Sequence, residues 1–182
     1  AIEKVRKIVG DVKKVGDEAV ISYAKKFDNV YLTKNKIQVS KKEVKEAYKK
    51  VNPKIISSLK IAAINIAKYA EYQLPSEWKK EINKGIFVGQ IVRPLDSVGC
   101  YVPGGNYPLV SSVLMTVIPA KVAGVKEIIV CCPKITKEIL AACYIAGADK
   151  VFRVGGAQAI AAMAYGTETI PKVNKIVGPG NI

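Results

Sequence analysis

The sequence contains no histidine in its 182 residues. Histidine is the commonest metal ligand in proteins and the usual general base near neutral pH, so its absence excludes sites that depend on an imidazole. The cysteines do not indicate a metal site either, because the sequence has no C-x-x-C pair among Cys100, Cys131, Cys132 and Cys143. Cys131 and Cys132 should point to opposite faces of a strand. We therefore expect buried, reduced thiols, with neither a catalytic histidine nor a metal site in this chain.

Long hydrophobic runs are also absent. The longest apolar stretch, residues 110–118, is too short and too interrupted by Ser and Thr to cross a bilayer. Residues 1–14 carry a charge every few positions and lack the apolar core of a signal peptide. We therefore expect a cytoplasmic protein without a membrane partner.

Acidic residues are scarce relative to basic ones: the chain has 29 Lys and Arg but 15 Asp and Glu, a formal net charge of +14. The excess lies in residues 1–90, which hold 20 of the Lys and Arg and 10 of the Asp and Glu. Lysine doublets on solvated helix faces explain this excess without any ligand. Nucleic-acid binding is the alternative, but no known binding motif accompanies the charge, so we expect no nucleic-acid partner.

The pattern up to about Gln73 predicts helices, because apolar residues repeat at helical spacing through most of this stretch. Residues 40–43, Ser-Lys-Lys-Glu, form a capping box at the start of one predicted helix. Pro53 stands at the first position of a longer one. Further along the chain, residues 86–88 and 90–92 predict two short strands.

From residue 98 the pattern changes to short apolar strands that alternate with helical segments. The predicted strands are 98–102, 127–132, 150–154 and 175–177, and the predicted helices are 109–123, 136–146 and 157–165. This alternation predicts a parallel sheet with right-handed crossovers. Pro119, inside the first of these helices, predicts a kink or a restart. The fold class is therefore α/β, with a mostly helical segment over residues 1–97 and an incomplete Rossmann-like parallel sheet over residues 98–182.

Three glycine-containing loops, at residues 103–106, 155–158 and 178–181, follow strands of the predicted sheet. They should share one sheet edge, where ligands of such folds bind. Glycine leaves room for a phosphate or a ribose beside the N–H groups of a helix start, and each loop ends in an amide, so the pattern suits a nucleotide. However, no G-x-G-x-x-G fingerprint occurs, and tight strand-to-helix turns need glycine on their own account. Turn geometry alone is therefore an equal alternative.

Several segments resemble histidinol dehydrogenase. They are RPLDSVGCYVPGGNYPLVSSVLMTVIPAKVAGVKEI, VGGAQAIAAMAYGTETIPKV, KIVGPGNI and, in the first part of the chain, GDEAVISYAKKFD. The resemblance covers nearly the whole chain and implies an aldehyde-dehydrogenase-like architecture. It also implies an oxidoreductase of histidine biosynthesis, a homodimer that oxidises L-histidinol through the aldehyde to L-histidine with two NAD and a bound zinc.

The resemblance further implies which residues bind NAD. The family uses the tyrosine of its Y-[VI]-P-G-G loop, the glutamine of G-G-A-Q and the asparagine of G-P-G-N, which are Tyr101, Gln158 and Asn181 here. All three belong to the glycine-loop regions at the predicted sheet edge. Each also has a structural alternative: an aromatic packed at a strand end for Tyr101, a helix cap for Gln158 and a turn residue for Asn181.

The zinc ligands and the proton-transferring Glu-His pair of the family lie beyond the G-P-G-N loop, and this chain has no such region. We therefore expect the N-terminal part of a longer enzyme that is inactive alone. Its residues 1–97 would be part of a discontinuous domain, and it would form a homodimer or otherwise self-associate. Glu168 is the carboxylate beyond residue 90 best placed to act as a base, although an exposed loop acid is the better description of it. A non-catalytic NAD-binding or assembly module is the alternative function.

Overall fold

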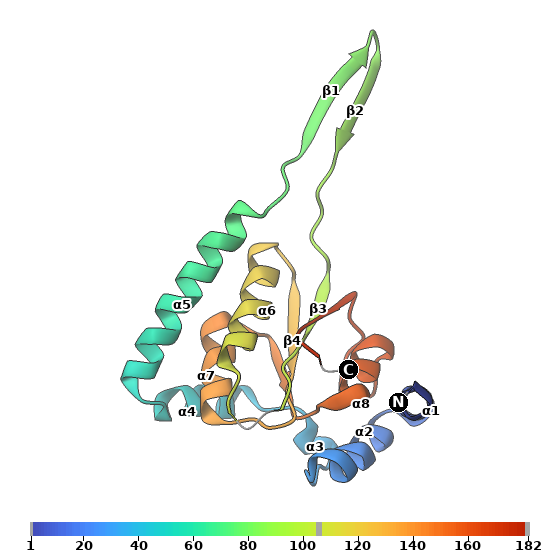
Figure 1. Ribbon diagram of the computed structural model, residues 1–182, viewed down its shortest axis with the longest axis vertical. Coiled ribbons are helices and arrows are strands. Elements are labelled where there is room, and N and C mark those ends of the chain that lie inside the picture. Colours follow the sequence, from blue (N-terminus) through green and yellow to red (C-terminus); the bar gives the residue numbers. More distant parts are fainter. Residues whose placement is uncertain (1, 105–106, 181–182) are drawn as a thin grey trace.

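The computed structural model describes residues 2–104 and 107–180. Its helices are α1 (Ile2–Val15), α2 (Asp17–Tyr23), the π-helical turn η1 (Ala24–Asp28), α3 (Lys34–Ile37), α4 (Lys41–Lys50), α5 (Pro53–Tyr72), α6 (Val110–Val122), α7 (Lys137–Ala146) and α8 (Gly156–Tyr165). Its strands are β1 (Trp78–Asn83), β2 (Ile86–Gln90), β3 (Ser97–Tyr101), β4 (Glu127–Cys131), β5 (Lys150–Phe152) and β6 (Lys175–Val177). The hairpin of β1 and β2 projects as a long arm from a body that holds all the other elements (Figure 1).

The central sheet has four parallel strands in the order β5-β4-β3-β6. Helices α6 and α7 lie on one face, and α8 lies on the other (Figure 1). Because both faces are covered, the strands are mainly apolar after a polar first residue and do not alternate with polar residues. The predicted α/β class with a Rossmann-like parallel sheet is confirmed.

Two apolar clusters lie on opposite faces of this sheet, and β4 contributes to both. Ile128 and Val130 belong to the cluster beneath α6 and α7, whereas Ile129 and Cys131 belong to the cluster beneath α8. Successive side chains of a strand alternate between its faces, which explains the division. Cys132 belongs to the first cluster, so the prediction that Cys131 and Cys132 point to opposite faces is confirmed.

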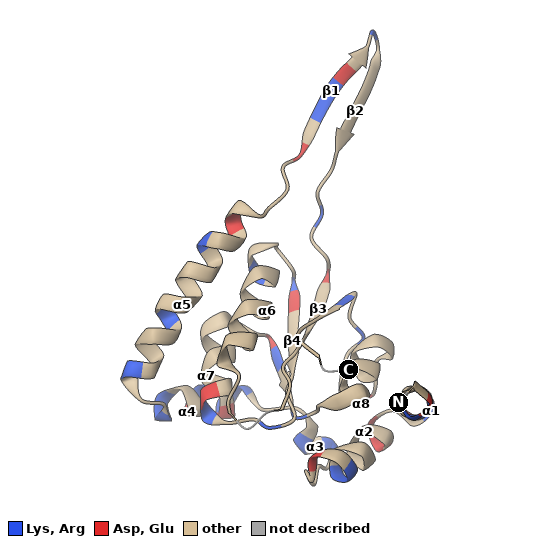
Figure 2. Cartoon of the chain, viewed as in Figure 1, with Lys and Arg blue, Asp and Glu red and all other residues tan. Residues whose placement is uncertain are grey.

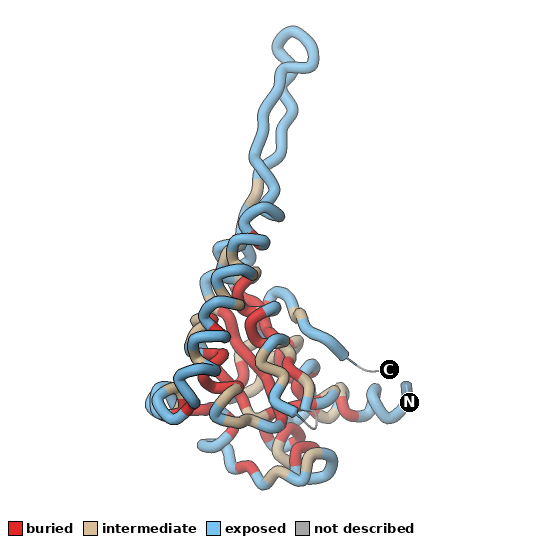
Figure 3. The backbone as a smooth tube through the Cα atoms, turned by 60° about the vertical axis from the view of Figure 1, so that its left-hand side comes forward, coloured by how far each residue is buried: buried red, intermediate tan, exposed pale blue. Residues whose placement is uncertain are grey.

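Helices from the first 97 residues contribute to both clusters. α4 packs on α7 and α5 on α6, while α1 and α2 pack against α8 on the far face. Buried residues are accordingly concentrated where these helices meet the sheet, and the arm is exposed along its length (Figure 3). The division of the chain at residue 97 stays a prediction, and the two parts share their apolar cores.

Side-chain caps start three of the helices. Ser40 Oγ accepts the N–H of Glu43 at 3.1 Å, and Asn52 Oδ1 accepts the N–H of Lys54 at 2.9 Å. Thr136 Oγ1 accepts an N–H in the first turn of α7 in the same way. The predicted capping box at residues 40–43 is only half formed, because the Glu43 carboxylate pairs with Arg153 beyond the end of β5. Glu43 therefore links α4 to the sheet.

Two of the local strand predictions were wrong in extent. Residues 86–88 and 90–92 are not separate strands, because one strand, β2, runs over Ile86–Gln90 and then ends. Its antiparallel partner β1 was not predicted, because Trp-Lys-Lys-Glu-Ile-Asn lacks the alternation of apolar and polar residues that marks a strand. Gly85, with φ of 81°, forms the tight turn between them.

Pro119 does not restart α6, which runs unbroken from Val110 to Val122. A proline removes the hydrogen bond to the carbonyl four residues earlier, here that of Met115. Met115 is 65% exposed, so water can reach this part of the helix and solvate the freed carbonyl. The helix therefore accommodates the proline without ending.

The basic residues of the first half are distributed over several outer elements, including α1, α4, α5 and the arm (Figure 2). Acidic residues such as Glu43, Glu77 and Glu81 lie among them. Within residues 2–104 and 107–180, none of the helices has the length and apolar character needed to span a bilayer.

Candidate functional site

The sheet order creates a topological switch point between β3 and β6. The chain leaves β3 through α6, on one face of the sheet, and reaches β6 from α8, on the other (Figure 1). Ligands of open α/β sheets bind beyond the carboxyl ends of the strands at such a point. A cleft of about 650 Å³ lies there. Its walls come from the end of η1, the loops after β3 and β4, the first turns of α8 and residues 176–180.

Glycines line this cleft at places where side chains would collide. A Cβ on Gly104 would lie 2.7 Å from the Pro133 ring, and a Cβ on Gly178 would collide with the Tyr101 carbonyl oxygen. Gly156 and Gly178 also have positive φ angles, 62° and 143°, that other residues rarely adopt. Parts of the predicted loops after β3, β5 and β6 therefore meet at one sheet edge and expose their backbone to the cleft.

Tyr101, predicted to bind NAD, ends β3 and lines the cleft. Its hydroxyl accepts a hydrogen bond from the N–H of Gly156, the first residue of α8, at 3.1 Å. Burial raises the pKa of the Tyr101 phenol, and this hydrogen bond opposes the rise. Because a helix N-terminus offers free N–H donors and a partial positive charge, the hydroxyl lies beside a place suited to an anionic ligand group.

Gln158, also predicted to bind NAD, is 1% exposed and is not among the described residues that line the cleft. Its Nε2 donates to Oδ2 of Asp28 at 3.4 Å, whereas its Oε1 has no hydrogen-bond partner in the described part of the chain. Oε1 lies beside Gly156, 2.7 Å from where a Cβ of that residue would stand. Buried polar atoms are rarely left without a partner. Gln158 contacts the cleft indirectly, because its hydrogen-bond partner Asp28 lines the cleft.

Asp28 and Lys134 line the cleft, and the sequence analysis missed both. Burial raises the pKa of Asp28, and the nearby positive charge of Lys134 lowers it. Asp28 ends a π-helical turn and is followed by Asn29 in the left-handed region, with φ of 55°. π-Helical turns occur often at functional sites, but the apolar pattern of this stretch predicts only an α-helix. Neither residue carried a local signal that could have identified it.

Asn181, the third predicted NAD ligand, lies outside the described residues, as does Asn106. The described residues just before Asn181, from Gly178 to Gly180, line the cleft. The role of Asn181 in cofactor binding stays a prediction.

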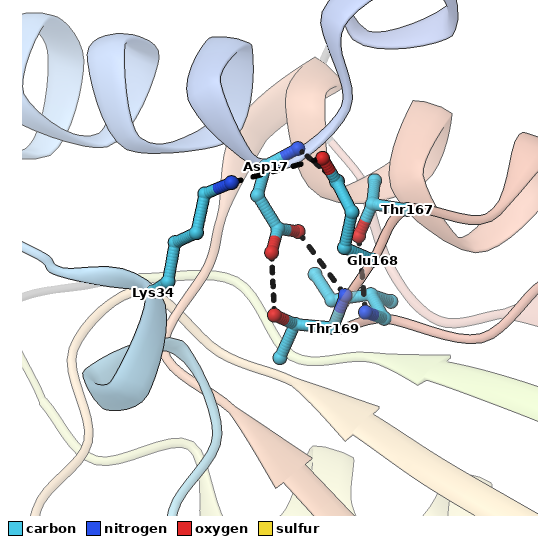
Figure 4. Close-up of polar contacts among 6 residues, drawn as sticks. Asp17, Lys34, Thr167, Glu168 and Thr169 are labelled. Carbon is cyan, nitrogen blue, oxygen red and sulfur yellow. Dashed lines mark hydrogen bonds and ion pairs between the residues drawn. The ribbon is translucent and has the colours of Figure 1, made fainter.

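Glu168 belongs to a polar network that lies apart from the residues lining the cleft (Figure 4). Its Oε2 accepts the N–H of Asp17, at the start of α2, at 2.9 Å, and Lys34 Nζ lies 3.9 Å from its Oε1. The hydrogen bond from Asp17 is the main cause that lowers the pKa of Glu168. The buried Asp17 carboxylate accepts both the N–H and the hydroxyl of Thr169. These contacts fasten the loop at residues 167–170 to α2, which fits the structural interpretation of Glu168.

The thiols and carboxylates of the described residues form no metal centre. The four cysteines are buried and free. Burial raises the pKa of Cys100 and Cys132 to about 11 and raises those of Cys131 and Cys143 as well. Within residues 2–104 and 107–180, no three or more His, Cys, Asp or Glu side chains are grouped so that they could hold a metal ion.

Comparison with known proteins identifies relatives along the whole chain. The family model described as histidinol dehydrogenase matches residues 1–182. Histidinol dehydrogenase from Methanothermobacter thermautotrophicus is 48% identical over 98% of this chain and 42% of its own length. That from Buchnera aphidicola is 52% identical over 99% of this chain and 41% of its own length. The chain thus spans about two fifths of the length of the curated relatives it matches.

A solved structure agrees with these relatives. The crystal structure of histidinol dehydrogenase from Elizabethkingia anophelis superposes with a TM-score of 0.92 at 40% sequence identity. The match covers 98% of this chain and 42% of that one. The fold, the family model and the curated relatives agree, and the chain belongs to the histidinol dehydrogenase family, in the N-terminal portion of its members.

Proposed function

We propose that this chain is the NAD-binding part of a cytoplasmic histidinol dehydrogenase, the oxidoreductase that converts L-histidinol to L-histidine. The observation that carries the proposal is the cleft at the switch point, where Tyr101 and Asp28 meet the N-terminus of α8. In this proposal residues 98–182 hold the dinucleotide, and residues 1–97 belong to a discontinuous domain.

Three features of the described residues fit a dinucleotide. Gly104, Gly156 and Gly178 leave the backbone accessible where Cβ atoms would intrude. The first turn of α8 offers N–H donors for a pyrophosphate. Beside that turn, the buried Oε1 of Gln158 has no hydrogen-bond partner among the described residues. Gln158 does not line the cleft, so it would act on a bound ligand through Asp28.

Tyr101 would bind and orient the cofactor from the cleft wall, and Gln158 would act through Asp28. Asn181, which follows β6 in the sequence, would supply the third contact. When bound, NAD supplies a hydride acceptor. Zinc does not fit the described residues, which contain no group of metal-ligating side chains, so we derive no zinc-dependent step from them.

Removing the proposed contacts should weaken NAD binding. Gln158→Ala and Tyr101→Phe are each expected to raise the dissociation constant by about 5- to 150-fold, since a lost hydrogen bond at a buried site costs about 1–3 kcal/mol. Isothermal titration of the 182-residue chain with NAD measures this. Tyr144→Phe, on the exposed side of α7, and Gln90→Ala, on the arm, are matched controls that should leave the affinity unchanged.

Two results would count against the site. If both cleft variants bind NAD as tightly as the unsubstituted chain, the assignment of Tyr101 and Gln158 is wrong. If the unsubstituted chain itself does not bind NAD, the proposed function of this part of the molecule is wrong.

We also propose that the chain self-associates through the arm formed by β1 and β2. Every residue of both strands is exposed, including the large apolar residues Trp78, Ile82, Ile86, Phe87 and Val88. An isolated two-stranded hairpin is at best marginally stable in water, so the arm needs a surface to pack on. A second copy of the chain supplies one, in keeping with the homodimer that the resemblance implies.

Sedimentation velocity tests this proposal. We expect a dimer or larger species, and we expect Ile82→Lys combined with Phe87→Lys to shift the population toward the monomer. Lys84→Glu, a charge change at the turn of the same arm, should leave the association unchanged. A monodisperse monomer with an ordered arm would contradict the proposal of self-association through the arm.

A further inference from the structure

Asp28 brings a carboxylate into a cleft that is otherwise suited to an anion. Among the described residues that line the cleft, Asp28 is the one acidic residue and Lys134 the one basic residue. The remaining lining residues are apolar, aromatic or glycine, apart from Asn29. An acid in this position lowers the affinity for any phosphate placed against it, so it needs an explanation of its own.

The Asp28 carboxylate accepts fewer hydrogen bonds than it could. Its one hydrogen bond among the described residues comes from Gln158 Nε2, at a long 3.4 Å. An ionised carboxylate has about four acceptor positions. Asp28 is partly buried, and this burial raises its pKa, so further hydrogen-bond donors would stabilise its ionised form. What would satisfy Asp28 is therefore a ligand that donates hydrogen bonds.

Gln158 contacts Asp28 from the first turn of α8. Gln158 is buried within α8, and the end of η1 comes to it from 130 residues away in the sequence. The Oε1 of the same amide faces Gly156 without a partner among the described residues. This arrangement fixes one edge of the Asp28 carboxylate and leaves the other free for the cleft.

Among the groups of a dinucleotide that donate hydrogen bonds, the vicinal hydroxyls of a ribose are a pair that one carboxylate can accept together. Phe27, next to Asp28, also lines the cleft and is 54% exposed, so it offers a flat apolar surface for the adenine attached to that ribose. Carboxylates that accept from a ribose 2′-hydroxyl are the usual device by which nucleotide-binding α/β folds prefer NAD to NADP. Here the acid comes from a π-helical turn outside the sheet.

We propose that Asp28 accepts hydrogen bonds from the adenosine ribose and thereby selects a dinucleotide with a free 2′-hydroxyl over one with a 2′-phosphate. Gln158 acts as the residue that positions Asp28. The inference rests on the proposed function, because it presupposes that a nicotinamide dinucleotide occupies the cleft. It adds the residue that distinguishes NAD from NADP.

The test compares the dissociation constants of NAD and NADP by isothermal titration of the 182-residue chain at one pH and salt concentration. The unsubstituted chain should favour NAD by about tenfold or more, because a like charge at the 2′ position is disfavoured. Asp28→Asn and Asp28→Ser should each reduce that ratio by about fivefold or more. Asp96→Asn removes the same charge from an exposed ion pair with Lys126, before the start of β3, and should leave the ratio unchanged.

The outcomes separate this inference from the proposed function. If NAD binds but both Asp28 variants keep the ratio of the unsubstituted chain, the inference is wrong and the proposed function stands. If neither dinucleotide binds the unsubstituted chain, both are wrong. Circular dichroism and thermal melts accompany each titration, and if neither Asp28 variant folds, Asp28 is a structural residue and the inference is overturned.

Discussion

The 182-residue chain is expected to form no NADH from L-histidinol, whether or not zinc is added. Oxidation of an alcohol requires a group that takes the hydroxyl proton, and this group must titrate near the working pH or be assisted by a metal ion. The sequence contains no histidine. The described residues contain no group of side chains that could hold a metal ion.

The carboxylates do not replace the missing groups. Asp149 Oδ2 accepts the N–H of Ile128 at the amino end of the sheet, on the opposite edge from the cleft. Glu168 is held by the N–H of Asp17, and this contact lowers its pKa, which weakens it as a base. Asp28 lies in the cleft, but a carboxylate without a metal ion or a second proton carrier makes a poor base for an alcohol.

The assay is NADH absorbance with histidinol, NAD and zinc, and histidinol dehydrogenase from Elizabethkingia anophelis serves as the positive control. We expect the rate of this chain to lie at least about 10²-fold below that of the control, since positioned proton transfer alone contributes about 10²–10⁴-fold. Turnover comparable to the control that is lost in Glu168→Gln or Asp28→Asn would show that the chain has a complete active site of its own.

Asp17→Ala is expected to destabilise the chain by about 2–4 kcal/mol, because it leaves two partly buried donors of Thr169 without an acceptor. Asp17 is fully buried, and its carboxylate accepts both the N–H and the hydroxyl of Thr169. These bonds join the first turn of α2 to a loop 152 residues away in the sequence (Figure 4). Their loss would release the loop that leads into β6, so the cleft should loosen as well.

Urea denaturation followed by circular dichroism gives the free energy of unfolding for each variant. Asp17→Asn keeps one acceptor oxygen and should cost less than Asp17→Ala. Glu168→Gln is the matched control at the exposed end of the same network, and it should leave the stability close to that of the unsubstituted chain, since its amide oxygen still accepts the Asp17 N–H. Equal stabilities for Asp17→Ala and the unsubstituted chain would mean that the network contributes nothing to the fold.

The sequence predicts those features that depend on local pattern. The β strands from Ser97 onward are short, mainly apolar segments, and their alternation with helices predicts a parallel sheet. That topology in turn brings the loops after β3 and β6 to one edge, so the position of Tyr101 beside the cleft follows from the strand and helix pattern alone. The resemblance supplied the cofactor, which the pattern left open.

The features that could not be predicted depend on contacts between distant segments. Asp28 enters the cleft because a π-helical turn redirects the chain, and its partner Gln158 lies 130 residues away. Gln158 lies in the first turn of α8, and its burial cannot be inferred from the G-G-A-Q motif. Strand β1 of the arm was missed for a different reason: it buries none of its residues, so it has no buried face to leave a pattern in the sequence.

The strand order has a consequence for how the chain acquires its fold. β3 is made before the other described strands of the sheet, but it lies between β4 and β6, and β6 is made after β4 and β5. Ser97 and Asn174, which join these strands, are 77 residues apart, and Asp17 and Glu168 are 151 residues apart. Pairings between such distant residues form slowly, because a long loop must close before any contact stabilises it. During synthesis on the ribosome, α1 and α2 therefore emerge early, and their apolar sides stay exposed until α8 has been made and can pack against them. In that interval the nascent chain is a natural client for chaperones.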